Sequence, residues 1–190
     1  MQARGVSNTS ATAIAKALGL GEVQVRKDLS AVSGAGKPKT GYQVADLISA
    51  LETQLGCHHK TQAVLVGAGE LGRALLNYDG FGAYGTEIVA GFDVNPPAPN
   101  TWKGLRPIYS VSDLPAFLAA HTIPIGIITV PAGVAQQVCD ALVKGGVQAI
   151  WSFAPVQLSV PESVILMQEN LALSLAFLNG QRNASSEIDG

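Results

Sequence analysis

A glycine-rich segment behind a short apolar run constrains the fold of this chain more than any other feature. The segment has the spacing G-x-G-x-x-G and directly follows the run Ala63–Val66. After a buried strand, the first glycine permits a tight turn, the second lets a pyrophosphate approach the backbone, and the third allows close packing of the following helix. Amides at the start of that helix point at the phosphates. The residues predicted to bind a cofactor here are Gly67, Ala68, Gly69, Glu70, Leu71 and Gly72.

Asp93 supplies the second part of this predicted site. It follows the next apolar run, Ile88–Phe92, near the offset of about 20 residues at which dinucleotide-binding folds place a ribose-binding acid. A carboxylate there accepts hydrogen bonds from both ribose hydroxyls and repels a 2′-phosphate, which favours NAD(H) over NADP(H). An acid that merely caps a turn is the structural alternative for Asp93. FAD and CoA-type nucleotides remain as alternative ligands.

Apolar runs alternate with helix-like stretches through residues 61–168. Such alternation is typical of a parallel sheet covered by helices on both faces, so we expect a Rossmann-type α/β domain over this range. Thr129, Val130 and Pro131 follow the third run and are predicted to line the pocket, because ligands of these sheets bind beyond the carboxyl ends of the strands. A plain strand-to-helix turn is the alternative there. The expected strands are 63–66, 88–92, 125–130, 149–153 and 164–166, and the expected helices are 69–78, 111–121 and 133–145.

The first 45 residues differ from the rest in charge. They carry six Lys or Arg and two acids, a net charge of +4, whereas the remaining residues carry six bases and twelve acids, a net charge of −6. A basic segment on an acidic body is typical of a module that binds a polyanion, although an ordinary solvated surface explains the charge equally well.

The pattern within this basic segment predicts a winged helix-turn-helix. Ser10 is a suitable N-cap for a helix that ends near Leu18, and a second helix is expected from Glu22 to Val32 after a glycine-containing turn. The glycine-rich stretch 34–42 is expected to form the wing. A further amphipathic stripe from Val44 predicts a linker helix, so the expected divisions are 1–45 for the winged helix, 46–60 for the linker and 61–168 for the Rossmann domain.

Other features exclude several classes of protein. The sequence has no apolar run of membrane-spanning length and no apolar signal core at its start, so we expect a cytoplasmic protein with no membrane partner. Cys57 and Cys139 lack metal-ligand spacing and are expected to be free thiols, with a regulatory disulfide as the alternative. No metal site and no metal cofactor are predicted.

The predicted nucleotide pocket lacks an obvious catalyst. A dehydrogenase needs a proton donor or acceptor such as His, Lys or Tyr near the reacting carbonyl. His121 is the only histidine after the glycine loop and falls at a predicted helix end, and Tyr78 has no lysine partner nearby. The Rossmann pattern also leaves no room for a substrate domain. We therefore predict no catalytic residues and a sensor rather than an enzyme.

Two longer strings resemble one known family, the Rex redox-sensing repressors of bacteria. They are QVRKDLS at residues 24–30 and GAGELGRAL at residues 67–75. Shorter matches follow in the family's order at residues 77–78, 92–94, 130–132 and 153–156, and the resemblance covers roughly residues 5–170.

The resemblance implies a homodimer that binds a palindromic double-stranded DNA operator and is released by NADH, with NAD⁺ opposing NADH. It places Arg26 and Lys27 on the recognition helix and brings Tyr78 and Phe153 towards the nicotinamide. The residues it assigns to DNA binding are Gln24, Arg26, Lys27, Ser30, Lys37 and Lys39.

This chain departs from the family pattern at three places. The family has a full helix ahead of the segment that begins this chain, so the winged helix is expected to be truncated. Ser152 stands where an asparagine commonly precedes Phe-Ala-Pro. Residues 169–190 are expected to form a shorter C-terminal helix and a polar tail, in which Leu171, Leu175 and Leu178 offer a dimer contact but no acid follows Glu169 within the helix.

We therefore favour an NADH-responsive repressor that senses the NADH/NAD⁺ ratio. The two alternatives are a small NAD-dependent oxidoreductase and a CoA-type nucleotide-binding module. The basic N-terminal segment and Asp93 argue against the CoA-type module, and the missing acid/base group argues against the oxidoreductase.

Overall fold

A computed structural model describes residues 6–34, 40–54, 56, 60–98 and 101–188, with side chains described up to residue 182. The chain forms two compact units. The first comprises Met1–Lys60 with Ala83–Gly85, and the second comprises Thr61–Gly82 with Thr86–Gly190. Each unit has its own hydrophobic core, and each is described here by itself.

The first unit is a small winged helix-turn-helix, as predicted, and residues 35–39 of the expected wing lie outside the described residues. Ser10 caps the first helix, because its Oγ accepts a hydrogen bond of 3.1 Å from the amide of Ala13. Gly19 ends that helix in a left-handed conformation, with φ of 67°. The elements are β1 (Asn8–Thr9), α1 (Ala11–Leu18), α2 (Glu22–Ser33), β2 (Tyr42–Gln43) and α3 (Val44–Gln54).

The core of the first unit joins all three helices. Ala15 of α1, Val25 and Leu29 of α2, and Leu47 of α3 are buried in one cluster. The predicted linker helix corresponds to α3, which packs with α1 and α2 through Leu47. β1 and β2 pair antiparallel beside the helices. Because Gly41 lies against the Thr9 carbonyl, a β-carbon there would collide with it.

The second unit contains a six-stranded, wholly parallel sheet in the order β5-β4-β3-β6-β7-β8. Numbered within this unit, the order is 3-2-1-4-5-6, the arrangement of a dinucleotide-binding Rossmann fold, which confirms the predicted fold class. The strands are β3 (Thr61–Val66), β4 (Thr86–Asp93), β5 (Ile108–Ser110), β6 (Ile125–Ile128), β7 (Ala149–Ser152) and β8 (Ile165–Gln168).

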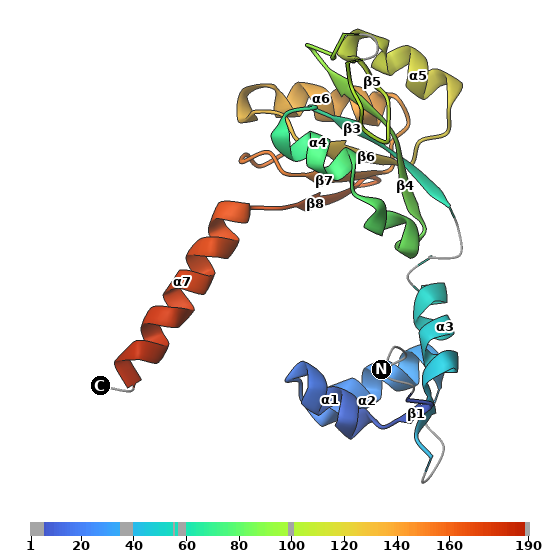
Figure 1. Ribbon diagram of the computed structural model, residues 1–190, viewed down its shortest axis with the longest axis vertical. Helices are drawn as coiled ribbons and strands as arrows, with labels where there is room; N and C mark the ends of the chain where they lie inside the picture. The colour runs from blue at the N-terminus through green and yellow to red at the C-terminus, as the bar shows by residue number, and fades with distance from the viewer. Residues whose placement is uncertain (1–5, 35–39, 55, 57–59, 99–100, 189–190) are drawn as a thin grey trace. The chain divides into compact units, whose positions relative to one another are not determined.

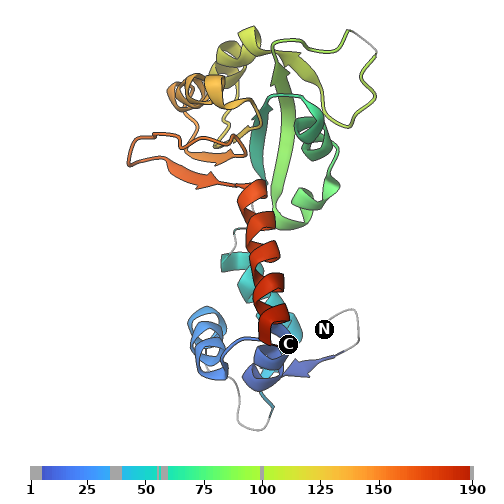
Figure 2. The same ribbon diagram turned by 90° about the vertical axis from the view of Figure 1, so that its left-hand side faces the viewer.

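Helices cover both faces of this sheet, with α5 and α6 on one side and α4 on the other (Figures 1 and 2). Alternate residues of β3 serve the two layers: Val64 and Val66 belong to the core beneath α5 and α6, while Ala63 and Leu65 belong to the core on the α4 side. The helices are α4 (Glu70–Leu76), α5 (Leu114–Ala120), α6 (Ala132–Lys144) and α7 (Leu171–Ile188), with 3₁₀ helices at Asp79–Tyr84 and Val111–Asp113.

The C-terminal helix differs from the prediction. A short helix was expected within 169–190, but α7 has 18 residues and continues through the polar segment that was expected to be a tail. Asn170 caps it, because its Oδ1 accepts a hydrogen bond of 2.9 Å from the amide of Leu173. The high helix propensity of its leucines and alanines explains the first half of the helix.

Three further predictions concern the cysteines, metal binding and membrane insertion. Cys139 is a free thiol buried in α6, and burial, reinforced by the neighbouring Asp140, raises its pKa and keeps it protonated. Cys57 lies outside the described residues. Within the described residues, no cluster of three or more His, Cys, Asp or Glu could hold a metal ion. No helix in the described part of the chain is long and apolar enough to cross a membrane.

Candidate dinucleotide site and nucleic-acid interface

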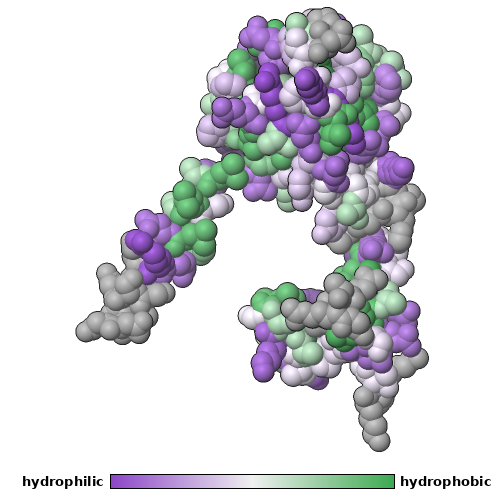
Figure 3. All heavy atoms as spheres, viewed as in Figure 1, coloured by the Kyte–Doolittle hydropathy of each residue, from purple (hydrophilic) through white to green (hydrophobic). Residues whose placement is uncertain are grey.

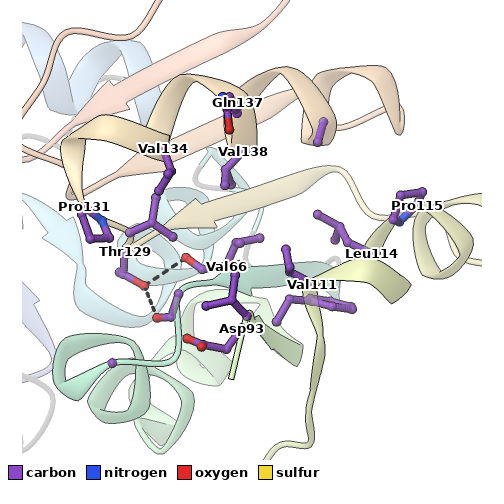
Figure 4. Close-up of a pocket in the computed structure, with 16 residues that line it drawn as sticks. Val66, Asp93, Val111, Leu114, Pro115, Thr129, Pro131, Val134, Gln137 and Val138 are labelled. Atoms are coloured by element: carbon purple, nitrogen blue, oxygen red, sulfur yellow. Dashed lines mark hydrogen bonds between the residues drawn. The ribbon is translucent and has the colours of Figure 1, made fainter. Parts of the chain in front are cut away.

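A pocket of about 660 Å³ opens where the strand order of the sheet reverses. The carboxyl ends of three strands meet there, because Val66 pairs with Phe92 on one side and with Ile128 on the other. Figure 4 shows the residues that line the pocket, with Val134 and Val138 projecting from α6 towards the strands. The lining residues are Val66, Gly67, Gly69, Phe92, Asp93, Val94, Val111, Leu114, Pro115, Thr129, Val130, Pro131, Val134, Gln137, Val138 and Ala141.

The glycine loop follows β3 and forms the floor of this pocket. Gly67 has φ of 104°, and a β-carbon on it would press against Thr129 and Val130 at 2.8 Å. Gly72 packs so closely on the Gly67 carbonyl that a β-carbon would overlap the carbonyl oxygen. At Gly69, by contrast, a β-carbon would meet open space. The loop is therefore tightly folded on its inner side and open on the side that lines the pocket.

Three side chains hold the loop in this shape. The Asp93 carboxylate accepts a hydrogen bond of 2.6 Å from the Ala68 amide through Oδ2. The Thr129 hydroxyl donates to the Gly67 carbonyl at 2.6 Å, and this bond is drawn as a dashed line in Figure 4. Arg73 Nε donates to the Ala68 carbonyl at 2.8 Å. Because the loop is pre-formed, little conformational entropy remains to be lost when a phosphate binds.

Asp93 has two structural partners as well as a place in the pocket. Its Oδ1 accepts a hydrogen bond of 2.8 Å from the Asn95 amide. A carboxylate can accept about four hydrogen bonds, so acceptor sites remain on both oxygens for a pair of ribose hydroxyls. The turn-capping role that the sequence left open as an alternative is thus present, and it is compatible with ribose binding.

The outer part of the pocket is almost wholly apolar. Val111 and Leu114 form one wall, and Val134 and Val138 of α6 form the other (Figure 4). Two apolar walls suit a flat aromatic base, and Gln137 of α6 adds an amide donor and acceptor to the lining. The glycine loop can thus accept a phosphate, the Asp93 carboxylate can accept hydrogen bonds from ribose hydroxyls, and the apolar walls can hold a base.

The structure brings only half of the predicted cofactor residues to the wall of this pocket. Gly67, Gly69, Asp93, Thr129, Val130 and Pro131 line it. Ala68, within the loop, is buried, with 3% of its surface exposed. Glu70, Leu71 and Gly72 form the first turn of α4, where no side chain caps the helix amides.

Tyr78 and Phe153 are not among the residues that line the pocket. Tyr78 is 60% exposed, and a run of edge-to-face and tilted rings connects it through Phe81 and Trp151 to Phe153, with centroid separations of 5.0, 6.0 and 4.6 Å. Phe81, Trp151 and Phe153 pack against the core on the α4 side of the sheet. Their approach to a nicotinamide therefore stays a prediction.

Several pocket residues were not predicted from the sequence. Val94, Val111, Leu114, Pro115, Val134, Gln137, Val138 and Ala141 line the pocket. Most of them belong to helix-like stretches whose apolar residues read as ordinary core. The signal that could have identified them is position, since the first turns of helices that follow strands face the ligand edge of such a sheet.

Four of the six residues predicted to bind DNA lie on α2. Arg26 is exposed and forms an ion pair with Glu22 one turn earlier. Gln24 donates to Asp28 at 2.7 Å, and the Ser30 hydroxyl donates to the Arg26 carbonyl at 2.8 Å. Lys27 is exposed. Lys37 and Lys39 lie outside the described residues.

Proteins similar to this chain over most of its length are transcriptional regulators. A redox-sensing transcriptional repressor Rex of Porphyromonas gingivalis is 40% identical over 178 residues, which are 94% of this chain and 82% of that protein. The repressor Rex of Streptomyces griseus is 36% identical over 186 residues, which are 97% of this chain and 74% of that protein.

Solved structures with the same fold include complexes with nucleotides and DNA. A crystal structure of RSP in complex with β-NAD⁺ and operator DNA matches with a TM-score of 0.89 and 31% identity, covering 99% of this chain and 87% of that one. RSP in complex with β-NADH matches with a TM-score of 0.87 and 30% identity, covering 99% and 88%. RSP is a Rex-family repressor. Residues 58–156 of this chain also match the family model of the CoA binding domain.

Proposed function

Since this chain belongs to the Rex family of redox-sensing transcriptional repressors, we propose that it binds operator DNA through α2 and is released when NADH fills the pocket of its Rossmann domain. The observation that carries this proposal is the presence of both parts on one chain. A pocket lined by a glycine loop and by Asp93 lies in the second unit, and a helix-turn-helix forms the first. A nucleotide sensor linked to a DNA reader is what a redox-controlled repressor requires.

The choice of NAD(H) over other nucleotides rests on Asp93 more than on the fold. CoA-binding and NAD-binding domains share this sheet, so the family match at residues 58–156 does not decide between the nucleotides. A carboxylate at the end of β4 favours free 2′- and 3′-ribose hydroxyls and repels phosphate on either oxygen. CoA carries a 3′-phosphate and NADP(H) a 2′-phosphate, so Asp93 favours NAD(H) over both.

We propose that the nucleotide is a signal rather than a substrate. Hydride transfer to a carbonyl needs a proton donor, usually His, Lys or Tyr. The residues that line the pocket in the described part of the chain include none of these.

We also propose that the protein is located in the bacterial cytoplasm, because a regulator that binds operator DNA acts in the compartment that contains the chromosome.

The C-terminal helix supports a homodimer. In the first half of α7, apolar side chains project on every side, and a helix that is apolar all round is normally buried. Leu171, Leu173, Leu175, Phe177 and Leu178 are each between 59% and 68% exposed, and Figure 3 shows the hydrophobic colour on the first half of this helix. The edge strand β8 adds Ile165 and Met167, at 73% and 59%. A second copy can cover both surfaces around a twofold axis, and a twofold dimer matches a palindromic operator.

An operator titration tests the proposed function. Labelled duplex containing a palindrome selected by this protein from random DNA is titrated with the protein alone, with NADH, with NAD⁺ and with CoA. We expect tight binding without ligand, release by NADH, protection by NAD⁺ against release, and no response to CoA. Release by CoA instead of NADH would establish the CoA-type module in its place.

Glu22 restrains Arg26, and its removal should strengthen DNA binding. In Glu22→Gln, the guanidinium no longer has to leave a carboxylate before it reaches a guanine, and one negative charge is removed from the DNA-facing helix. We expect the operator affinity to rise by up to about fivefold per half-site at low salt, because exposed ion pairs are worth up to about 1 kcal/mol. Arg26→Ala should lower operator affinity, with NADH affinity unchanged in both variants. A gel shift that neither substitution alters would remove this pair from the interface.

A further inference from the structure

The exposed face of α2 carries an apolar side chain as well as basic and polar ones. The inner face of this helix carries Val25, Leu29 and the half-buried Val32, spaced at i, i+4 and i+7. Val23, Lys27 and Ser30 repeat the same spacing, each two residues before its counterpart on the inner face, and two residues correspond to about 200° around a helix. These three side chains therefore occupy the centre of the face that points away from the core of the first unit.

Val23 is out of place on this face. It is 71% exposed at the second position of α2, where propensity alone does not favour a β-branched residue. The polar neighbours at the sides of this face are engaged within the helix, since Arg26 pairs with Glu22 and Gln24 bonds to Asp28. Val23 thus presents two methyl groups beside a lysine that lies one turn further along.

We propose that Val23 reads a thymine in the operator by packing against its C5-methyl group. This inference rests on the proposed DNA-binding function. The N-terminal residues of a recognition helix contact base edges in the major groove. The C5-methyl of thymine is the methyl group displayed there, and an apolar side chain contacts it in direct readout.

The spacing on α2 also defines where this thymine lies. Residues four apart are about 6 Å apart along a helix, and successive base pairs are about 3.4 Å apart. A thymine contacted by Val23 therefore lies one or two base pairs from the base or phosphate contacted by Lys27. A dimer repeats the contact in the second half-site, so two symmetry-related thymines are read.

Replacing thymine by uracil tests the contact, because it removes only the methyl group. The operator is selected from random duplexes with the wild-type protein, and each symmetric pair of dT is changed to dU in turn. Burial of one methyl contributes about 0.8 kcal/mol, which is about a fourfold change. We expect one symmetric pair of dT→dU changes to weaken wild-type binding by about 15-fold, with each half-site contributing about fourfold.

Val23→Ala should bind the thymine operator more weakly and should lose most of this dependence on the methyl. Leu18→Ala is the matched control, since Leu18 is a similarly exposed apolar residue of the first unit, at 64%, at the end of α1 rather than on the outer face of α2. We expect it to keep the full dU penalty. An unchanged penalty in Val23→Ala, or no sensitive dT in the selected operator, would overturn the inference alone. If no duplex is enriched at all, the proposed function fails and the inference fails with it.

Discussion

Asp93→Asn should lower the affinity for NADH by about tenfold and should raise the affinity for NADPH. The asparagine oxygen can still accept the hydrogen bond from the Ala68 amide that holds the glycine loop. It carries no charge, so the charge-assisted bonds to the ribose weaken by about 1 to 2 kcal/mol. The repulsion of a 2′-phosphate disappears at the same time. Fluorescence titration of the two nucleotides measures both affinities.

Asp93→Ala separates the two roles of this carboxylate. It removes the ribose acceptor and also frees the Ala68 amide, so the loop loses one of its three side-chain anchors. We expect NADH affinity to fall by about 100-fold, and NADPH affinity to fall less, because loosening the loop affects both nucleotides and losing the ribose bonds affects only one. Glu162→Gln, which neutralises an exposed acid outside the pocket, is the control. Equal losses for both nucleotides in both Asp93 variants would contradict the discriminating role.

Leu175→Asp should convert the proposed dimer to monomers and abolish tight operator binding. Leu175 is 68% exposed on the apolar half of α7. If a second copy covers this helix, the substitution buries an unpaired carboxylate, which costs several kcal/mol. A monomer contacts one half-site, so we expect operator affinity to fall by at least about 100-fold. Analytical ultracentrifugation and a gel shift on the same samples measure the two effects.

The matched control for this prediction lies on the same helix. Asn179→Asp introduces the same charge one turn further along, where α7 becomes polar. We expect it to remain dimeric with unchanged operator affinity. A wild-type protein that sediments as a monomer, or a Leu175→Asp variant that stays dimeric with native circular dichroism, would show that α7 does not form the interface.

The sequence predicted those elements that depend on only a few neighbouring residues. The glycine spacing behind Ala63–Val66 indicated the strand, turn and helix, and Ser10 and Gly19 marked the ends of α1. These signals are strong because a left-handed backbone or a close approach admits few residue types. The three-residue edge strand β5 was missed, since so short a run shows no periodicity.

Local sequence patterns were not sufficient to predict which residues line the pocket. Valines of α6 and of the segment after β5 look like core residues in the sequence, and some of them are partly buried against the core. Only the strand order places Val111 and Val134 on facing walls above the glycine loop. The same holds for Asp93, whose bond to the Ala68 amide spans 25 residues. Tyr78 and Phe153, which the resemblance assigned to the nicotinamide, join a separate row of aromatic rings.

The sequence by itself determined the two kinds of domain, the glycine loop, the acid at the end of β4 and the helix-turn-helix. Each of these depends on backbone conformation or on apolar periodicity over a few neighbouring residues. The tertiary structure decided which side chains meet: the three anchors of the loop, the apolar slot and the outward position of Val23. These contacts depend on the order of the strands and the orientation of the helices. Packing between segments distant in sequence sets both, and a local sequence pattern does not predict them.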